Sequence, residues 1–402
     1  MTGTDHTALI KDVVHTTIAG GRNLFCAWPW TGGIHNFGNG EIVIAYTEKP
    51  CAYQTYEDTQ HGESEGRLVL CRTLDGGKSW PEAQRQVVRD NRVPFDDWIQ
   101  QGGEPALVDM NGENAMFLFW RSFSRDPWLT ADGRLAYRPV SFALRSTDRG
   151  HHWHLPAVVV PHAHMDSIYA GTSYLKMPDD SILAAFGGYR YAPGSGKAAD
   201  QEKEAGARRA AQDESERRPS RSVMYISKDQ GRHWYFFSTI AYEDRDDMDC
   251  AYPAVLRLPT GRLLGTVGYR FVRSYLASTS WTSVTHSDDD GRTWSAPRRI
   301  NDLGDQANLC RLSDGRIVCI YGYRFVPYGI RGIVSEDDGE TWSREFIVRA
   351  DGAGPDLGYP VVTELEDGRI LTVYYFNLKD EIDTQAFRGG RRFISASTFR
   401  LA

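Results

Sequence analysis

Ser287-Asp-Asp289-Asp-Gly291-Arg-Thr-Trp294 is one of five copies of the pattern Ser/Thr-x-Asp-x-Gly-x-x-Trp in this chain of 402 residues. In each copy the Asp side chain can accept hydrogen bonds from backbone N–H groups of its own turn, and the Gly can adopt the positive φ that a tight turn requires. The Trp can fold back over the turn and bury a large apolar surface. Recurrence at roughly 50- to 80-residue intervals predicts a repeat architecture. The other copies begin at Thr73, Ser146, Ser227 and Ser335.

A second repeat, a hairpin of two apolar runs joined by a short polar turn, precedes each of these segments and occurs once more after the last. The flanking runs, such as residues 41–46 and 369–374, have the composition of strands. Six hairpins predict an all-β fold, a six-bladed β-propeller, which grows by adding blades and not by enlarging one core. The turns are Asn39-Gly40, Asn111-Gly112, Asp179-Asp180, Thr260-Gly261, Asp314-Gly315 and Asp367-Gly368.

The sixth hairpin is not followed by an Asp-containing segment, so its blade needs strands from elsewhere in the chain. We expect residues 392–398 as its third strand and the N-terminal residues 12–18 as its fourth. Pairing the two chain ends in this way closes the propeller and removes an open sheet edge. A single propeller domain is therefore expected over residues 1–402.

Residues 193–221 interrupt blade 3 between its second and third strands. They are rich in Ala, Glu and Arg and contain almost no apolar side chain. This composition is typical of a solvated helical or disordered excursion. The alternative is a lid over the mouth of the propeller.

Composition and charge exclude several classes of function. The net charge of -7 argues against nonspecific nucleic-acid binding, and no apolar run approaches the 18 residues of a membrane span. The first residues lack a basic and an apolar signal region, so a cytoplasmic protein is expected, or an exported one if a signal has been removed. The six cysteines show neither a CxxC pair nor a zinc spacing. We therefore expect reduced core thiols, no metal and no other cofactor.

The alternating direction of the strands within a blade sorts residues onto two faces. The Asp-containing turns join the third and fourth strands and lie on one face, where we expect a structural role. Residues just after the second strand lie on the opposite face, around the central funnel. Four second strands end there in an arginine: Arg121, Arg190, Arg270 and Arg324.

Four arginines at one mouth of an acidic protein indicate a site for a carboxylate, phosphate or sulfate. The alternative is that each pairs with a carboxylate of the neighbouring blade, as Arg324 would with Asp356. Interleaved aromatic residues can either stack on sugars or pack between blades; they include Trp28, Trp30, Tyr189, Tyr269 and Tyr323. The starts of the inner strands add His35, Glu104, His164, Asp166, Asp249, Tyr252, Asp305, Asn308, Asp356 and Tyr359 to the same mouth.

The repeated segment is the Asp-box, and with the blade pattern it makes nearly the whole chain resemble the sialidase (neuraminidase) superfamily of BNR-repeat β-propellers. The resemblance implies three arginines that bind the substrate carboxylate, a Tyr nucleophile activated by a Glu, and an Asp that protonates the leaving group. It places Tyr359 on the nucleophile strand, Arg270 at the second arginine and Asp58 in the acid loop, residues 53–63.

Three positions depart from that pattern. Trp30 stands in place of the first arginine, and Tyr252 in place of the activating Glu. The strand of the third arginine reads Asp305-Gln-Ala-Asn308. The incomplete arginine triad favours a superfamily member that processes another sugar over a standard sialidase.

The leading hypothesis is an exo-acting glycoside hydrolase on an anionic or decorated saccharide. Its catalytic candidates are Asp58, Glu104, Asp166, Asp249, Asp356 and Tyr359, which could supply the acid and the nucleophile or base. A polysaccharide lyase is the alternative enzyme, in which arginines neutralise a uronate while His35, His164 or a Tyr abstracts the α-proton. A non-catalytic sugar-binding propeller remains a third hypothesis. The expected substrate-binding residues are Arg121, Arg190, Arg270, Arg324, Trp30, Tyr252 and Asn308.

Overall fold

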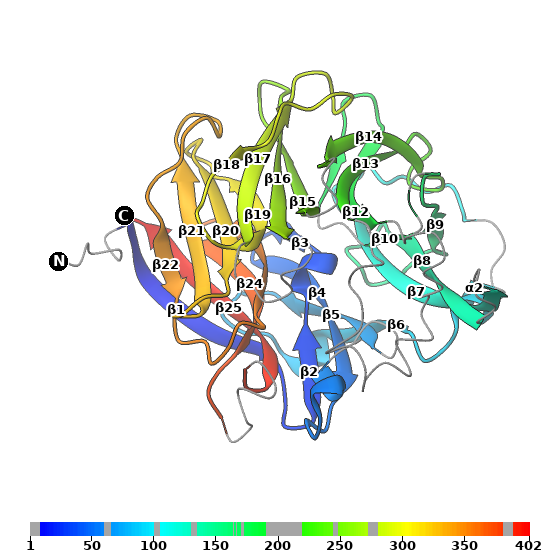
Figure 1. Cartoon of the computed structure of the whole chain (residues 1–402), viewed down its shortest axis with the longest axis horizontal. Helices are drawn as coiled ribbons and strands as arrows, with labels where there is room; N and C mark the ends of the chain where they lie inside the picture. The colour runs from blue at the N-terminus through cyan, green and yellow to red at the C-terminus, as the bar shows by residue number, and fades with distance from the viewer. Residues whose placement is uncertain are drawn as a thin grey trace.

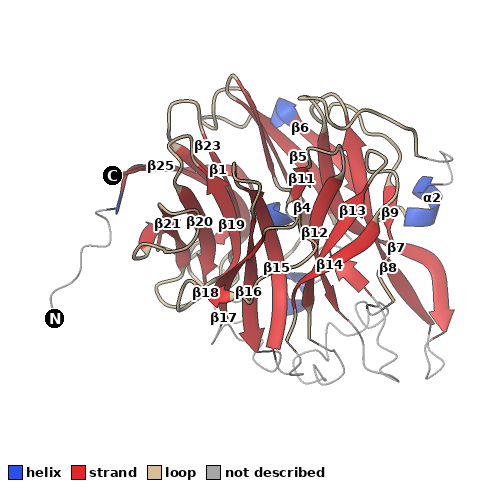
Figure 2. Cartoon of the chain, turned by 90° about the horizontal axis from the view of Figure 1, so that it is seen from above, coloured by secondary structure: helices blue, strands red, loops and turns tan. Residues whose placement is uncertain are grey.

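A computed structural model describes residues 9–59, 66–99, 105–129, 135–163, 165, 167–169, 173–189, 219–243, 248–271, 280–380 and 389–402. Six β-sheets are arranged as blades around a common axis (Figure 1). Strands account for nearly all of the regular structure (Figure 2). The predicted six-bladed β-propeller is therefore confirmed. Most of the insertion at 193–221 lies outside the described residues.

The strand order in each blade runs from the axis outward. Blade 1 contains β2 (Leu24–Ala27) and β3 (Ile34–Gly38) in line, then β4 (Glu41–Pro50), β5 (Arg67–Thr73) and β6 (Arg85–Asp90). Blade 2 contains β7 (Met116–Leu129), β8 (Leu135–Ser146) and β9 (Ala157–Val159). Blade 3 contains β10 (Ser167–Tyr169) and β11 (Tyr174–Lys176) in line, then β12 (Ile182–Tyr189), β13 (Arg221–Ser227) and β14 (Tyr235–Ala241).

The remaining blades have four strands each. Blade 4 contains β15 (Met248–Arg257), β16 (Leu263–Phe271), β17 (Ser280–Ser287) and β18 (Arg298–Arg299). Blade 5 contains β19 (Asp305–Arg311), β20 (Ile317–Tyr323), β21 (Gly329–Ser335) and β22 (Phe346–Arg349). Blade 6 contains β23 (Gly358–Glu364), β24 (Ile370–Asn377), β25 (Arg392–Leu401) and β1 (Ile10–Ala19). The short helices are η2 (Pro29–Thr31), η3 (Tyr56–Thr59), η4 (Glu82–Gln84) and α2 (Phe95–Ile99).

The closure of the propeller by its two chain ends is confirmed. β1 pairs antiparallel with β25 along most of its length, with His15 opposite Ser397. Figure 1 shows the blue N-terminal and red C-terminal strands side by side. Nδ1 of His15 lies 2.7 Å from the Ser397 hydroxyl oxygen, which adds a side-chain contact to the ladder.

Blade 2 departs from the predicted pattern, because residues 105–110 before the Asn111-Gly112 turn form no strand in the described part of the blade. Side chains bind the backbone groups that a ladder would otherwise use. The Met110 N–H donates to the side-chain oxygen of Gln230 at 2.8 Å, and Arg145 donates to the Ala106 carbonyl at 2.9 Å. Backbone polar groups that are satisfied in this way do not require sheet pairing.

The five Asp-boxes have the expected hydrogen bonds. In blade 4 the Asp289 carboxylate accepts from the Thr293 N–H at 2.9 Å, and the Ser287 hydroxyl oxygen accepts from the Gly291 N–H at 2.9 Å. Gly291 has a φ of 85°, a conformation that glycine adopts without steric cost. The same bonds recur in the boxes that begin at Thr73, Ser146, Ser227 and Ser335.

The Asp-box tryptophan of blade 3 joins neighbouring blades. Trp234 is only 4% exposed, and its ring packs edge-on against Phe117 and Phe119 of blade 2, with centroid distances of 5.8 and 5.3 Å. Its indole N–H donates to the Gly231 carbonyl at 3.1 Å. The hydrophobic cores therefore lie between blades, and the boxes stabilise those contacts.

Trp234→Ala should lower the free energy of unfolding by about 3–5 kcal/mol, because it empties a buried site between two blades. Activity per folded molecule should stay at the wild-type level. Thermal or urea unfolding measures the first effect, and an assay corrected for the folded fraction measures the second. Tyr235→Ala is the matched control, since Tyr235 is the next residue and 62% exposed. A folded Trp234→Ala variant that had lost its activity would contradict a structural role for the Asp-boxes.

Candidate active site

Among the described residues, four blades hold one non-glycine residue in the left-handed conformation within the inner strand or directly after it. Each of these residues directly follows a paired residue at a break in the ladder with the second strand. Such a conformation costs on the order of 1–3 kcal/mol and persists where the surrounding structure enforces it, often at functional sites. A bulge of this kind redirects a side chain. The four residues are Trp28 (φ 58°), Tyr252 (φ 56°), Gln306 (φ 57°) and Tyr359 (φ 51°).

Two of these residues meet across the funnel. The Tyr359 hydroxyl of blade 6 donates to the Tyr252 hydroxyl of blade 4 at 2.9 Å, and their ring centroids are 5.2 Å apart. Trp30 packs edge-on against both rings, at 5.5 Å from Tyr252 and 6.1 Å from Tyr359. Tyr169 of blade 3 lies 5.8 Å from Tyr252 on the other side. The Tyr252–Tyr359 pair thus lies in an aromatic cluster built from blades 1, 3, 4 and 6.

Two arginines lie beside the tyrosine pair. The guanidinium carbon of Arg270 is 5.4 Å from the centroid of the Tyr252 ring, and that of Arg324 is 5.5 Å from the Tyr359 ring. Arg270 also donates to the Asp249 carboxylate at 3.0 Å within blade 4. Asp249 is buried, and its other oxygen accepts from the Ser220 N–H at 2.6 Å. Each of the two tyrosine rings therefore has one positive charge beside it.

A hydrogen-bonded network in blade 6 holds Arg324. Its Nη2 donates to the Tyr375 hydroxyl at 3.2 Å, and its Nε donates to the Leu357 carbonyl at 3.1 Å. The Tyr375 hydroxyl in turn donates to the Asp356 carboxylate at 2.6 Å, while Arg392 donates to the other carboxylate oxygen at 2.9 Å. Asp356 thus forms its ion pair with Arg392. The Tyr375 hydroxyl links it by hydrogen bonds to Arg324.

The electrostatic environment separates these groups into charged and neutral ones. Burial alone would raise the pKa of Asp356, but the guanidinium groups of Arg392 and Arg324 hold that pKa below its usual range. Burial raises the pKa of Tyr359 well above 10, and the Tyr252 hydroxyl adds to this effect although Arg324 opposes it. The site therefore contains an ionised Asp356 and a neutral Tyr359.

The repeated Gly-Tyr-Arg segment has a packing reason. A Cβ at Gly268 would lie 3.4 Å from the Cβ of Asp305 in blade 5, and a Cβ at Gly322 would lie 3.0 Å from the Cα of Gly358 in blade 6. Glycine thus allows each blade to approach the bulge of the next. The following arginine then lies at the funnel end of its strand, opposite the Asp-box end: Arg270 pairs with Ser280, whereas Leu263 pairs with Ser287.

Three other predicted residues are bonded to or packed against the protein itself. The Asp58 carboxylate accepts from the backbone N–H groups of Gln54 and Thr55, at 2.8 and 3.1 Å, and so caps its own turn. The Asn308 side-chain oxygen accepts from the Val362 N–H at 3.3 Å and joins blades 5 and 6. His35 lies between Phe37 and Tyr174, and burial lowers its pKa to about 4, so its imidazole is neutral.

The prediction that the second strand of blade 2 ends at Arg121 is wrong, because Arg121 pairs with Ser141 within β7 and the strand continues to Leu129. The Arg121 carbonyl accepts from the Asn91 side chain at 3.0 Å. The predicted site residues outside the described part of the chain are Glu104, His164, Asp166 and Arg190.

Sequence reasoning missed Tyr169, Tyr375 and Arg392. A signal for Tyr169 exists in the sequence, because Asp-x-x-Tyr occurs in three inner strands, as Asp166 to Tyr169, Asp249 to Tyr252 and Asp356 to Tyr359.

Within the ranges that the structure describes, no three His, Cys, Asp or Glu side chains are grouped as metal ligands. None of the described helices is long and apolar enough to cross a membrane.

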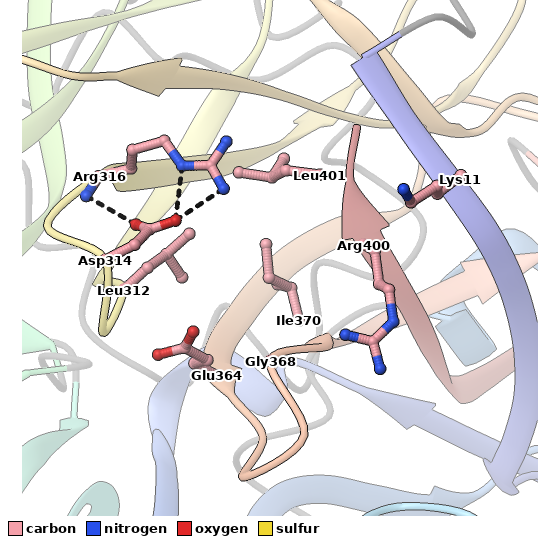
Figure 3. Close-up of a pocket in the computed structure, with 9 residues that line it drawn as sticks. All are labelled: Lys11, Leu312, Asp314, Arg316, Glu364, Gly368, Ile370, Arg400 and Leu401. Atoms are coloured by element: carbon pink, nitrogen blue, oxygen red, sulfur yellow. Dashed lines mark hydrogen bonds and ion pairs between the residues drawn. The ribbon is translucent and has the colours of Figure 1, made fainter.

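A cavity of about 290 Å³ lies on the opposite face, between the hairpin turns of blades 5 and 6 (Figure 3). Three of its charged groups have protein partners: Arg316 pairs with Asp314 at 2.7 Å within the blade 5 hairpin, and Glu364 of blade 6 accepts from the Ser313 hydroxyl of blade 5 at 2.9 Å. Arg400 donates to the Asp367 carbonyl at 2.6 Å. Because these polar groups are bound within the protein, and no strained non-glycine residue or aromatic cluster lines the cavity, the tyrosine pair is the stronger candidate for the active site.

Comparison with known proteins supports the propeller. Residues 51–372 match the family model described as "BNR repeat-like domain". No curated protein matches the chain. A solved protein of unknown function from Dyadobacter fermentans is 19% identical, with a TM-score of 0.68 and coverage of 98% of this chain and 99% of that one.

Two solved enzymes share the same fold. An alpha-L-arabinanase from Penicillium chrysogenum, complexed with arabinobiose, is 14% identical with a TM-score of 0.58, and the match covers 96% of this chain and 98% of that one. A Trypanosoma rangeli sialidase in complex with sialic acid is 13% identical with a TM-score of 0.56. That match covers 98% of this chain but 59% of the sialidase. At such identities the likeness shows the fold.

Proposed function

This chain belongs to the BNR repeat-like domain family, and from that premise we propose that it is an exo-acting glycoside hydrolase for an anionic or decorated saccharide. One observation carries the proposal. Tyr252 and Tyr359, both in the left-handed conformation, join their hydroxyls at 2.9 Å, and each ring has a guanidinium group beside it. Strained backbone that brings two hydroxyl groups together, with a cation beside each ring, is expected of an active site and is costly for packing alone.

The aromatic cluster and the arginines suit an anionic sugar. The faces of Trp and Tyr rings pack against the apolar C–H groups of a sugar ring, while their polar atoms bind its hydroxyls. Arg324 donates hydrogen bonds from Nε and Nη2 to residues of blade 6, and its Nη1 is not bound by any other described residue. A planar guanidinium group binds a carboxylate or sulfate strongly. We assign the anionic group of the substrate to Arg324, with Arg270 on the opposite side.

The reaction needs a proton donor at the leaving oxygen and a base or nucleophile. A neutral Tyr359 hydroxyl can donate a proton, and the Tyr252 hydroxyl can pass one back to it along their shared hydrogen bond. The ionised Asp356 and the nearby Asp305, whose pKa is raised by burial, differ in their preferred protonation states. Such a difference is typical of acid–base sites. We assign direct contact with the saccharide to the tyrosines and an electrostatic role to the two carboxyl groups.

A polysaccharide lyase is the second candidate, and a specific observation favours it. The Tyr359 hydroxyl is bonded to another phenol and not to a carboxylate that would activate it as a nucleophile. In β-elimination a base removes the proton next to a uronate carboxylate, a C=C bond forms, the C–O bond breaks and the leaving oxygen takes up a proton. Arginines would neutralise the carboxylate, and the tyrosine pair would move the protons.

A single screen separates these reactions. The protein is incubated with a panel of aryl glycosides and uronate polysaccharides, and the products are measured as reducing ends and as ultraviolet absorbance of unsaturated uronates. A hydrolase releases reducing ends without that absorbance, whereas a lyase produces both. Binding without any product would instead indicate a sugar-binding propeller. The arabinanase complexed with arabinobiose and the sialidase in complex with sialic acid have the same fold, which supports a saccharide ligand.

A further inference from the structure

Asp305 lies where two Gly-Tyr-Arg segments meet. Its backbone pairs with Gly322 across the β19–β20 ladder, and its Cβ lies against Gly268 of blade 4. Arg324 and Arg270 stand two residues beyond these two glycines, and both guanidinium groups act electrostatically on the Asp305 carboxyl. The Asp305 side chain thus lies near the two arginines to which we assign the anionic group of the substrate.

The carboxyl group of Asp305 is buried and incompletely bonded. The residue is 3% exposed, and Oδ1 has no hydrogen-bond partner among the described residues. No ion pair within 4 Å involves this side chain in the described part of the structure. A buried ionised carboxylate without such partners is costly, whereas the protonated form carries no net charge. Burial accordingly raises the pKa of Asp305, although Arg324 and Arg270 oppose the effect.

Two guanidinium groups act on the Asp305 carboxyl, and they come from blades 4 and 5. Arg270 of blade 4 pairs with Asp249, whereas Arg324 of blade 5 forms no ion pair within the described part of the structure. The Asp356–Arg392 pair of blade 6 is linked to Arg324 by the Tyr375 hydroxyl. When Asp305 is protonated, Arg324 therefore has no ionised carboxylate within ion-pair distance among the described residues, and when Asp305 is ionised its charge acts on Arg324 in competition with an anionic ligand.

We propose that Asp305 is protonated when an anionic ligand binds, so that the negative charge of the ligand takes the place of the Asp305 carboxylate. The funnel then binds a monoanionic sugar together with one proton. This inference rests on the proposed function and specifies its substrate as a sugar with a single acidic group. Protonated Asp305 leaves the arginines available to the ligand, and ionised Asp305 competes with it. Affinity for the anion is therefore highest at low pH and falls as the pH rises through the pKa of Asp305. A neutral sugar lacks this dependence.

The first test needs no ligand. A carboxyl group whose pKa is higher in the folded than in the unfolded chain costs stability as the pH rises from the unfolded to the folded pKa. Asp305→Asn keeps the shape and cannot ionise, so its Tm should rise relative to wild type from about pH 4, the unfolded pKa, up to the folded pKa of Asp305 and then stay level. Asp302→Asn, an exposed position in the preceding loop, is the control and should follow the wild-type curve. Parallel curves for wild type and Asp305→Asn would overturn the proposal.

The second test measures binding of glucuronate by calorimetry between pH 5 and pH 9, with glucose as the neutral sugar. Wild-type affinity for glucuronate should fall about tenfold for each pH unit above the pKa of Asp305, as expected for one linked proton. Asp305→Asn should bind glucuronate with an affinity that does not change with pH. An equal slope in the variant would overturn the proposal. If glucuronate binds neither protein while the Tm curves diverge as expected, Asp305 holds its proton but the anionic substrate class is wrong.

Discussion

Tyr359→Phe should lower turnover at least about 100-fold and leave the Tm close to that of wild type. The substitution removes one oxygen and keeps the ring, which packs near Trp30, Tyr252 and Tyr375. The missing hydroxyl is the one that reaches Tyr252 and is assigned to proton transfer, a step that contributes about 10²- to 10⁴-fold. Initial rates on the best substrate from the screen, corrected for the folded fraction, measure the effect.

The control for this prediction is Tyr323→Phe. Tyr323 is also at the funnel end of a strand, but its ring faces Arg331, with the guanidinium carbon 3.7 Å from the centroid. It is not part of the tyrosine pair, so its turnover should remain near wild type. Near-normal turnover of Tyr359→Phe, or an equal loss in Tyr323→Phe, would rule out a catalytic role for the Tyr359 hydroxyl.

Arg324→Gln should reduce kcat/KM for the anionic saccharide by about 10- to 150-fold, the equivalent of one charged hydrogen bond of about 1.5–3 kcal/mol. The loss should be smaller for a neutral analogue of the same sugar. The ratio of the two kcat/KM values is the measurement, because it cancels any change in the folded fraction.

Arg316→Gln is the matched control, since Arg316 pairs with Asp314 on the opposite face (Figure 3). It should leave the ratio between the anionic and neutral substrates unchanged. An equal loss for both substrates in Arg324→Gln would mean that Arg324 supports the fold of blade 6 and does not bind the anionic group.

Local patterns made most of the fold predictable. Each Asp-box and each hairpin turn is specified by residues within about eight positions, and the closing strand follows from the missing strand of blade 6. The inner strand of blade 2 was predicted wrongly, because side chains of Arg145 and Gln230 bind its backbone groups. Arg145 of β8 and Gln230 of the Asp-box turn in blade 3 are far from residues 105–110 in the sequence, so no local pattern predicts these contacts.

The candidate site was only partly predictable. Strand alternation placed Arg270 and Arg324 at the funnel, but the partners of Tyr359 depend on contacts between residues far apart in the sequence. Asp249 and Asp356 were among the predicted catalytic residues, whereas the Tyr359 hydroxyl meets Tyr252, 107 positions away. The suggested pair of Arg324 with Asp356 also differs from the structure, in which Arg392 binds Asp356. In the sequence, nothing distinguishes Tyr375 from other tyrosines of buried strands, because its role depends on its hydrogen bonds to Arg324 and Asp356.

A crystal structure of the protein with a saccharide or product from the screen would locate the active site. We expect the sugar ring in the funnel, with one hydroxyl or glycosidic oxygen in hydrogen-bond distance of Tyr359 and its acidic group on Arg324. A sugar bound on the Asp-box face, or in the cavity between the hairpins of blades 5 and 6, would contradict an active site at the tyrosine pair.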